Sequence, residues 1–227
     1  MSITLFGTCR LNKINNHNNL NNLINYTHST KEIIQFIKFI KGELIIAKPY
    51  DKLCFRTGIM DNKCINYNNI YKQKFIDTKI FIIEICSYKN YIHNGYYLHH
   101  LSVDKRFPNY TKTPLNILNN YKLIKQNNKE IENDIIEIRK LLYPKKIIIV
   151  SHYNSILNDG KYIQSRNHLI ILLHIICKKH EIHFINPKNV LSKFAQNIIM
   201  TSDLGHYTDF GLNEFSKYMN NYVKMLI

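Results

Sequence analysis

Two short, almost wholly aliphatic runs constrain most strongly what this chain can fold into. The run at 147–150 is continuously apolar and β-branched, and the run at 80–86 is interrupted only by Glu84. Strands that lack alternation between apolar and polar residues are covered on both faces, as in a parallel sheet. These runs therefore predict two buried strands with helices on either side of them.

Strand-length runs and helical patterns alternate along the whole chain. Further apolar runs lie at 3–6, 44–46 and 182–185. Helical patterns occur at 31–41, 131–142, 167–180, 187–194 and 209–225. This alternation predicts an α/β layered sheet.

The length of 227 residues favours one domain, spanning 1–227. The segments 54–75 and 89–121 are polar, aromatic and irregular, so we expect them to be insertions over one edge of the sheet. The Asn-rich stretch 12–25 fits either a poor helix or a loop.

The predicted strand ends bring chemically useful residues to one rim, because ligands of an open parallel sheet bind beyond the carboxyl ends of its strands. Each of these residues follows a predicted strand or precedes the last helix: Cys9, Ser87, His152, Asn154, Asp203 and His206. The sequence thus predicts a single site at that rim.

Cys9 and the Asp203/His206 pair carry the candidate chemistry. A Cys at a strand-to-helix turn gains thiolate character from the helix N-terminus and from a nearby imidazole. If Asp203 accepts a hydrogen bond from one imidazole nitrogen of His206, the other nitrogen becomes the proton acceptor. The alternatives are a small buried apolar residue for Cys9 and simple turn and cap residues for the other two.

The Gly7-Thr8-Cys9 turn resembles the Gly-Asp-Ser turn of SGNH (GDSL-type) hydrolases and acyltransferases, and Asp203-Leu204-Gly205-His206 resembles their last motif. A Gly-x-Cys turn is also similar to that of capsule-polysaccharide enzymes with a related fold. The resemblance implies a three-layer sandwich with a mostly parallel, flavodoxin-like sheet. It further implies a triad of Cys9, His206 and Asp203.

The chain departs from that family at three places. Cys9 stands where the family's turn has Ser, Thr8 stands where it has Asp, and no Gly-x-Asn-Asp motif follows the 80–86 run. An Asn side chain of that motif contributes to the family's oxyanion hole, and Ser87 could donate a hydrogen bond in its place.

Several further residues are candidates for binding. Ser29 and Glu32 form a capping box, and the exposed amides at that helix start could also hold an oxyanion or a phosphate. Arg10 and Arg166 could clamp an anionic substrate or a cofactor phosphate. His152 and Asn154 could contact substrate from a strand end, although a structural role suits that His equally well. His99, His100 and nearby tyrosines suggest either a sugar-stacking wall or an ordinary aromatic loop core.

The amino-acid composition limits which binding partners and which cellular compartment we expect. Lys and Arg number 31 against 16 acidic residues, a net charge of +15 that attracts phosphates and anionic sugars, although AT-rich codon usage accounts equally well for part of it. The lysines are scattered and no binding motif is present, so no specific nucleic acid is expected.

Five cysteines without paired spacing predict neither a disulfide framework nor a zinc site, and no metal is expected. No apolar run is long enough to span a bilayer, and no signal peptide is evident, which predicts a soluble cytoplasmic protein.

Together these features predict an SGNH-like acyl-ester hydrolase or acetyltransferase that acts on a glycan or sugar through a thioester at Cys9. A carbohydrate or another acyl acceptor would be the partner. No cofactor is required, and acetyl-CoA is one candidate donor. The alternative is a non-catalytic module of the same fold that binds an anionic glycan or a nucleotide-sugar through Arg10 and Arg166.

Overall fold

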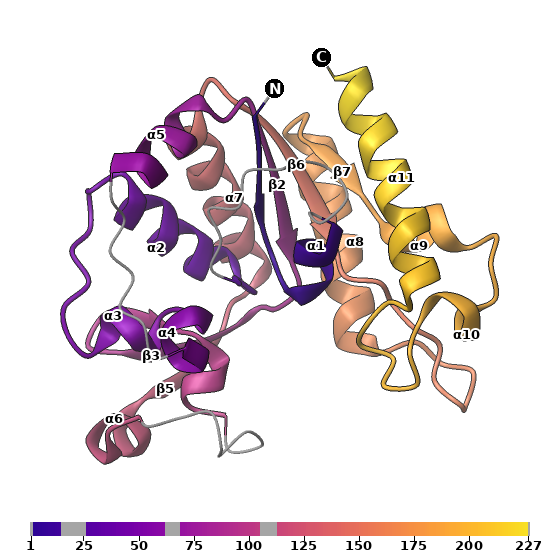
Figure 1. Ribbon diagram of the computed structural model, residues 1–227. Coiled ribbons are helices and arrows are strands. Elements are labelled where there is room, and N and C mark those ends of the chain that lie inside the picture. Colours follow the sequence, from indigo (N-terminus) through magenta and orange to yellow (C-terminus); the bar gives the residue numbers. More distant parts are fainter. Residues whose placement is uncertain (1, 15–25, 62–68, 105–112, 227) are drawn as a thin grey trace.

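A four-stranded parallel sheet forms the centre of the protein (Figure 1). The computed structural model describes residues 2–14, 26–61, 69–104 and 113–226. The strands run in the order β1 (Ile3–Phe6), β2 (Ile80–Ile85), β6 (Lys146–Ser151) and β7 (His183–Ile185). Ile82 of β2 pairs in register with Leu5 of β1 and Ile148 of β6, and all six residues of β2 are buried. The two aliphatic runs are therefore the inner strands, as predicted.

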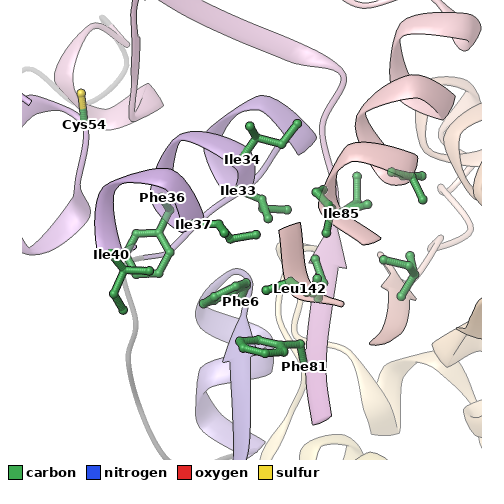
Figure 2. Packing of buried hydrophobic residues seen from close by; sticks show 14 of the residues in the cluster. Phe6, Ile33, Ile34, Phe36, Ile37, Ile40, Cys54, Phe81, Ile85 and Leu142 are labelled. Atoms are coloured by element: carbon green, nitrogen blue, oxygen red, sulfur yellow. The ribbon is translucent and has the colours of Figure 1, made fainter. Parts of the chain in front are cut away.

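Helices cover both faces of this sheet and form the outer layers. On one face α2 (Thr30–Ile40), α7 (Asn128–Leu142) and α8 (Gln164–Lys179) pack on the side chains of Phe6, Phe81 and neighbouring strand residues (Figure 2). The other face is covered by α1 (Cys9–Ile14), α9 (Pro187–Leu191), α10 (Gln196–Ile199) and α11 (Asp209–Met225). The three layers and the parallel sheet confirm the predicted fold class.

One predicted strand was wrong. The run at 44–46 is irregular, and the side chain of Ile45 is 84% exposed. Gly42, with a positive φ of 78°, ends α2 just before this run, and the run pairs with none of the described strands, so nothing holds it in a sheet. A flavodoxin-like sheet has a strand outside the first one; among the described strands, β1 pairs with β2 alone.

The segment 89–121 was expected to be irregular, and this expectation was also wrong. It contributes β3 (Lys89–His93) and β4 (Tyr96–Leu98) to a small antiparallel sheet, in which β5 (Lys122–Lys125) is the third strand. The turn between β3 and β4 is Asn94-Gly95, and both residues have positive φ, as a two-residue hairpin turn requires. The short helices η2 (His100–Ser102) and α6 (Leu115–Asn120) follow.

The other expected insertion, 54–75, is partly helical where it is described. It contains α4 (Arg56–Asp61) and the start of α5 (Asn69–Asp77), and α3 (Tyr50–Leu53) precedes it. Of the Asn-rich stretch, residues 12–14 belong to α1 and residues 15–25 lie outside the described part. Among the helices that the structure describes, none combines the length and apolarity needed to cross a membrane.

Candidate active site

The turn after β1 requires a glycine. A Cβ atom on Gly7 would lie 2.8 Å from Cβ of Glu84 and 3.0 Å from Cδ2 of Leu11, closer than side chains approach each other. Without that Cβ, the turn passes directly against β2, and α1 begins two residues later at Cys9. The thiol of Cys9 is free and half-buried at the carboxyl end of β1.

Glu84, on the neighbouring strand β2, holds this turn in place. Its carboxylate is buried near the end of β2 and accepts hydrogen bonds from the Thr8 amide (2.9 Å), the Thr8 hydroxyl (2.5 Å) and Nε of Arg10 (3.2 Å). A buried carboxylate is tolerated only when it is paired and hydrogen-bonded, and Glu84 is both. The residues on either side of Cys9 are therefore anchored to the neighbouring strand.

Arg10 connects this turn to a second loop. Besides its ion pair with Glu84, it donates through Nη1 to the carbonyl of Gly205. Burial, the largest single influence, lowers the pKa of Arg10, but Glu84, Cys86, Tyr207 and Cys9 together raise it by more, so the pKa lies above its ordinary value. A fixed cation next to Cys9 in sequence thus holds the loop 203–206.

The loop 203–206 contains a preformed Asp–His pair. Nδ1 of His206 lies 2.6 Å from Oδ2 of Asp203, and the two side chains are about half exposed, at 49% and 54% respectively. Oδ1 of Asp203 accepts from the Thr201 hydroxyl (2.6 Å) and the Gly205 amide (2.8 Å). These two bonds, and then the bond with His206, hold the pKa of Asp203 well below its usual range.

This geometry fixes the roles of the imidazole nitrogens. An ionised carboxylate only accepts hydrogen bonds, so Nδ1 of His206 is the donor and Nε2 is left with its lone pair as a proton acceptor. The loop is thus arranged for general base chemistry.

A second arginine supports the same loop. Nη1 of Arg166, near the start of α8, donates to the carbonyl of Leu204 at 3.0 Å, and the Ser155 hydroxyl donates to the same carbonyl at 3.2 Å. Leu204 has a positive φ of 53°, so these bonds hold a backbone conformation that non-glycine residues rarely adopt. Burial, followed by the charge of Arg10, lowers the pKa of Arg166.

His152 and Asn154 lie just beyond the end of β6 and are buried. Nδ1 of His152 lies 2.7 Å from the carbonyl of Tyr153, so Nδ1 carries the proton and Nε2 is the acceptor. Burial, and then the charges of Arg10 and Arg166, lower the pKa of His152 well below 6.5, which keeps it neutral. Nδ2 of Asn154 donates to Asn167 over 3.5 Å, and its buried Oδ1 has no partner among the described residues.

Ser87 and Ser29 make local bonds. The Ser87 hydroxyl accepts from the Lys89 amide at 3.0 Å, and the Ser87 amide donates to the carbonyl of His28. Ser29 is fully buried, caps α2 by accepting from the Glu32 amide, and donates to Oδ1 of Asn90 at 2.6 Å. The capping role of Ser29 is therefore the one observed, and an oxyanion role for either serine stays a prediction.

Comparison with known protein families decides where the chain belongs. The family model of the TviD N-terminal domain matches it in two overlapping segments, 1–116 and 101–222. The chain is a member of the TviD N-terminal domain family. A relative, the Vi polysaccharide biosynthesis protein TviD of Salmonella typhi, is 29% identical over 115 residues. That match covers 49% of this chain but only 14% of the relative.

Two solved structures with a similar arrangement are distant in sequence. A G-D-S-L family lipolytic protein from Veillonella parvula is 11% identical, with a TM-score of 0.49 over 96% of this chain and 94% of the other. A carbohydrate acetylesterase from Sinorhizobium meliloti is 12% identical, with a TM-score of 0.40 over 100% and 99% of the two chains.

In this TviD N-terminal domain, the two halves of the predicted triad are joined through Arg10. The Asp203–His206 pair is formed, and Arg10, next to Cys9, donates to Gly205 within the same loop. Among the described residues no hydrogen bond joins the Cys9 thiol to His206. The triad as a whole therefore remains a prediction.

Glu84 is a member of the site that was not predicted. In the sequence it interrupts an aliphatic run, whereas in the structure its carboxylate anchors Thr8 and Arg10. The signal was present, since a single carboxylate in a doubly covered strand requires a buried partner. Arg10 and Arg166 were predicted to bind anions. Arg10 instead bonds to the Glu84 carboxylate and the Gly205 carbonyl, and Arg166 to the Leu204 carbonyl, and anion binding by them stays a prediction.

Proposed function

We propose that this chain transfers or hydrolyses an acyl group, acetyl in the simplest case, on a polysaccharide. Cys9 is the nucleophile, His206 the general base and Asp203 the residue that orients it. The observation that carries the proposal is the hydrogen bond from Arg10 to the carbonyl of Gly205. It holds the loop of the Asp203–His206 pair against the turn that carries Cys9, although these segments lie at opposite ends of the chain.

The chemistry follows from the orientation of the imidazole. Nε2 of His206 takes the thiol proton of Cys9, and the thiolate attacks the acyl carbonyl of the donor. The tetrahedral intermediate expels the donor's leaving group, which receives that proton from His206, and a thioester on Cys9 remains. His206 then removes a proton from the acceptor hydroxyl, which attacks the thioester and regenerates the thiol. A sugar as acceptor gives transfer, and water gives hydrolysis.

The polysaccharide acceptor is supported by the family. The relative from Salmonella typhi is a Vi polysaccharide biosynthesis protein, and the net charge of +15 suits an anionic acceptor or a phosphorylated donor. Acetyl-CoA is our candidate donor. Attack within this site requires the thiol and Nε2 of His206 to come within hydrogen-bond reach, and substrate binding is the step at which we expect this.

The non-catalytic alternative is less well supported. It relies on Arg10 and Arg166 as ligands for an anionic glycan or a nucleotide-sugar. Both guanidinium groups already donate to carbonyls of the loop 203–206, so each has less capacity left for a ligand.

The test is to trap the acyl-enzyme. The purified chain is incubated with acetyl-CoA or p-nitrophenyl acetate, quenched in acid, and the peptide that contains Cys9 is analysed by mass spectrometry. We expect one acetyl group on that peptide, none in Cys9→Ala, and slow acetylation in His206→Ala. The matched control is His168→Ala, which removes an exposed imidazole on α8 and should react like the wild type.

Base-treated polysaccharides, Vi polysaccharide among them, are then added as acceptors. Faster loss of the acetyl group with an acceptor than with water alone indicates transfer, and equal rates indicate hydrolysis. Turnover that survives unchanged in Cys9→Ala would refute the proposed mechanism.

A further inference from the structure

Three histidines outside the candidate active site form a cluster between the central parallel sheet with its helices and the small antiparallel sheet of β3, β4 and β5, here called the inserted sheet. His28 lies just before α2, and His99 and His100 follow β4. Each offers a ring nitrogen, and the three nitrogens lie within 4.8 Å of one another. His99 is fully buried, so of the two alternatives for this residue the sugar-stacking wall is excluded and the aromatic loop core remains.

The rings lie close to the spacing that ligands of one ion have. Their centroids are 4.9 Å apart for His28 and His99, 4.4 Å for His28 and His100, and 4.5 Å for His99 and His100. With metal–nitrogen bonds of about 2 Å in a tetrahedral arrangement, ring centroids of imidazoles around one ion lie roughly 5 Å apart and their ligand nitrogens about 3.3 Å apart. Binding would therefore require the rings to rotate so that their nitrogens, now within 4.8 Å of one another, converge on the ion.

Two buried ring nitrogens in this cluster have no hydrogen-bond partner among the described residues. Nδ1 of His28 and Nε2 of His99 are enclosed and make no hydrogen bond within the described structure. An enclosed polar atom without a partner is costly, and each such case in a native protein calls for an explanation such as an ion that is not seen. The cluster therefore contains two donor atoms whose partner remains to be supplied.

The cluster is enclosed and has one basic and one acidic neighbour. His99 is fully buried, and Arg56 is among the positive charges that act on it. Oε2 of Glu32 lies 3.6 Å from Nδ1 of His28 and places a buried carboxylate beside the cluster. This carboxylate partly offsets the positive charge of Arg56 nearby.

We propose that His28, His99 and His100 bind a divalent transition-metal ion, Zn²⁺ in the first instance, with water or Glu32 in the fourth position. Three imidazoles with one further ligand form a recognised zinc geometry. The carbonyl of His28 accepts from the amides of Cys86 and Ser87, so the ion would join the inserted sheet to the end of β2. The cysteine spacing gave no sign of zinc because no thiol belongs to this cluster.

Binding would change an existing contact of His99. The amide of Leu101 donates to Nδ1 of His99 at 3.2 Å, which places the neutral proton on Nε2. Ligation through Nε2 moves that proton to Nδ1 and breaks this bond, which is at the long end of the normal range. Three metal–nitrogen bonds would outweigh the loss of one weak hydrogen bond.

The experiment is a metal titration of the full chain without a histidine tag. The protein is stripped with a chelator, and Zn²⁺ is titrated in competition with a chromogenic chelator of known affinity. We expect one equivalent of Zn²⁺ per chain and a thermal midpoint that rises by several degrees when Zn²⁺ is added. Co²⁺ should give a visible spectrum of nitrogen and oxygen ligands without an intense thiolate charge-transfer band.

His28→Gln and His100→Gln should weaken Zn²⁺ binding at least tenfold. The matched control His168→Gln changes an exposed imidazole on α8 that bonds only to Asn128 among its described contacts, and it should bind like the wild type. Circular dichroism checks that each variant is folded. The wild type alone also tests the proposal. If it binds less than a tenth of an equivalent of Zn²⁺ at a micromolar concentration of free Zn²⁺, the proposal is overturned, whether or not the variants fold. Equal affinity in all variants, or a thiolate band with Co²⁺, also overturns it.

Discussion

At the scale of single residues, Glu84 and Arg10 form the buried pair on which the candidate site rests. Arg10 is held between the Glu84 carboxylate and the carbonyl of Gly205. The side chain of Glu84 is 4% exposed and that of Arg10 is 10% exposed. Removing one member of a buried ion pair leaves the other uncompensated, which is more damaging than removing both. This asymmetry provides a direct test.

Glu84→Gln should lower the free energy of unfolding by about 3 kcal/mol, because Arg10 is left buried without its counter-charge. Arg10→Met should have a similar effect. The double variant should be more stable than the sum of the two losses predicts, and denaturant unfolding of all four proteins measures the difference. Strictly additive losses would show that the two side chains do not depend on each other.

Asp203→Asn tests the orienting carboxylate. An Asn side chain can donate to Nδ1 of His206, which would leave the proton on Nε2, the nitrogen that has to act as the base. If the proposed function is correct, kcat/KM at neutral pH should fall about a hundredfold or more, whereas KM changes little. Steady-state kinetics with p-nitrophenyl acetate measures both constants. An active Asp203→Asn enzyme would show that the pair serves only to shape the turn.

These contacts could not be predicted from the sequence, although the residues could be proposed. Asp203 and His206 lie three positions apart, so a local motif reveals them. Glu84 and Gly205 lie 74 and 195 positions from Arg10, and only the folded topology brings the three together. A sequence pattern indicates which residues are unusual, but it does not show which distant partners they meet.

At the scale of elements, long periodic segments were predicted best. The helix α11 was predicted at 209–225 and is observed at Asp209–Met225, because a capping Thr208 and an amphipathic pattern both mark it. The strand predicted at 44–46 was wrong because a short apolar run does not determine pairing, and the hairpin observed at 89–98 was not predicted. The Asn94-Gly95 turn was a usable hairpin signal that polar, aromatic surroundings obscured.

Gly211 shows how packing between elements reverses a helix propensity. Replacing a helical glycine by alanine usually stabilises a helix by about 1 kcal/mol. A Cβ at Gly211 would lie 2.3 Å from the carbonyl oxygen of Ile199 in α10, which is backbone and cannot move aside cheaply. Gly211→Ala should therefore separate α10 from α11 and lower the free energy of unfolding by about 2 kcal/mol or more.

The control for this change is Asn213→Ala, an exposed position on the same helix. It should alter stability by less than about 0.5 kcal/mol. Denaturant unfolding compares both variants with the wild type. A stabilised Gly211→Ala protein would mean that α10 and α11 are not packed as described.

At the scale of the whole molecule, two buried neutral histidines make stability depend on pH. His152 lies at the rim of the parallel sheet and His99 at the junction with the inserted sheet, and burial is the main reason that the pKa of each lies well below 6.5. In the unfolded chain each ionises with an ordinary pKa near 6.5. The unfolded state therefore binds more protons than the folded state below that pH.

The sign follows from this difference. Their contribution to stability is fully present above pH 6.5 and is lost as the pH falls below it, by up to about 1.4 kcal/mol per pH unit for each histidine. We expect the free energy of unfolding to fall by roughly 2–3 kcal/mol between pH 7 and pH 5.5, before carboxylates begin to titrate. Denaturant unfolding of the metal-free protein across this range measures the slope.

His152→Gln should remove about half of that slope, whereas His168→Gln, which changes an exposed imidazole, should leave it unchanged. The absolute stability of His152→Gln at pH 7 is expected to be lower, because its bond to the Tyr153 carbonyl is altered, but the slope depends only on the lost titration. If the wild type keeps the same stability from pH 7 to pH 5.5, both imidazoles must be able to take up a proton in the folded state. The rim and the junction would then be more open to water than their burial implies.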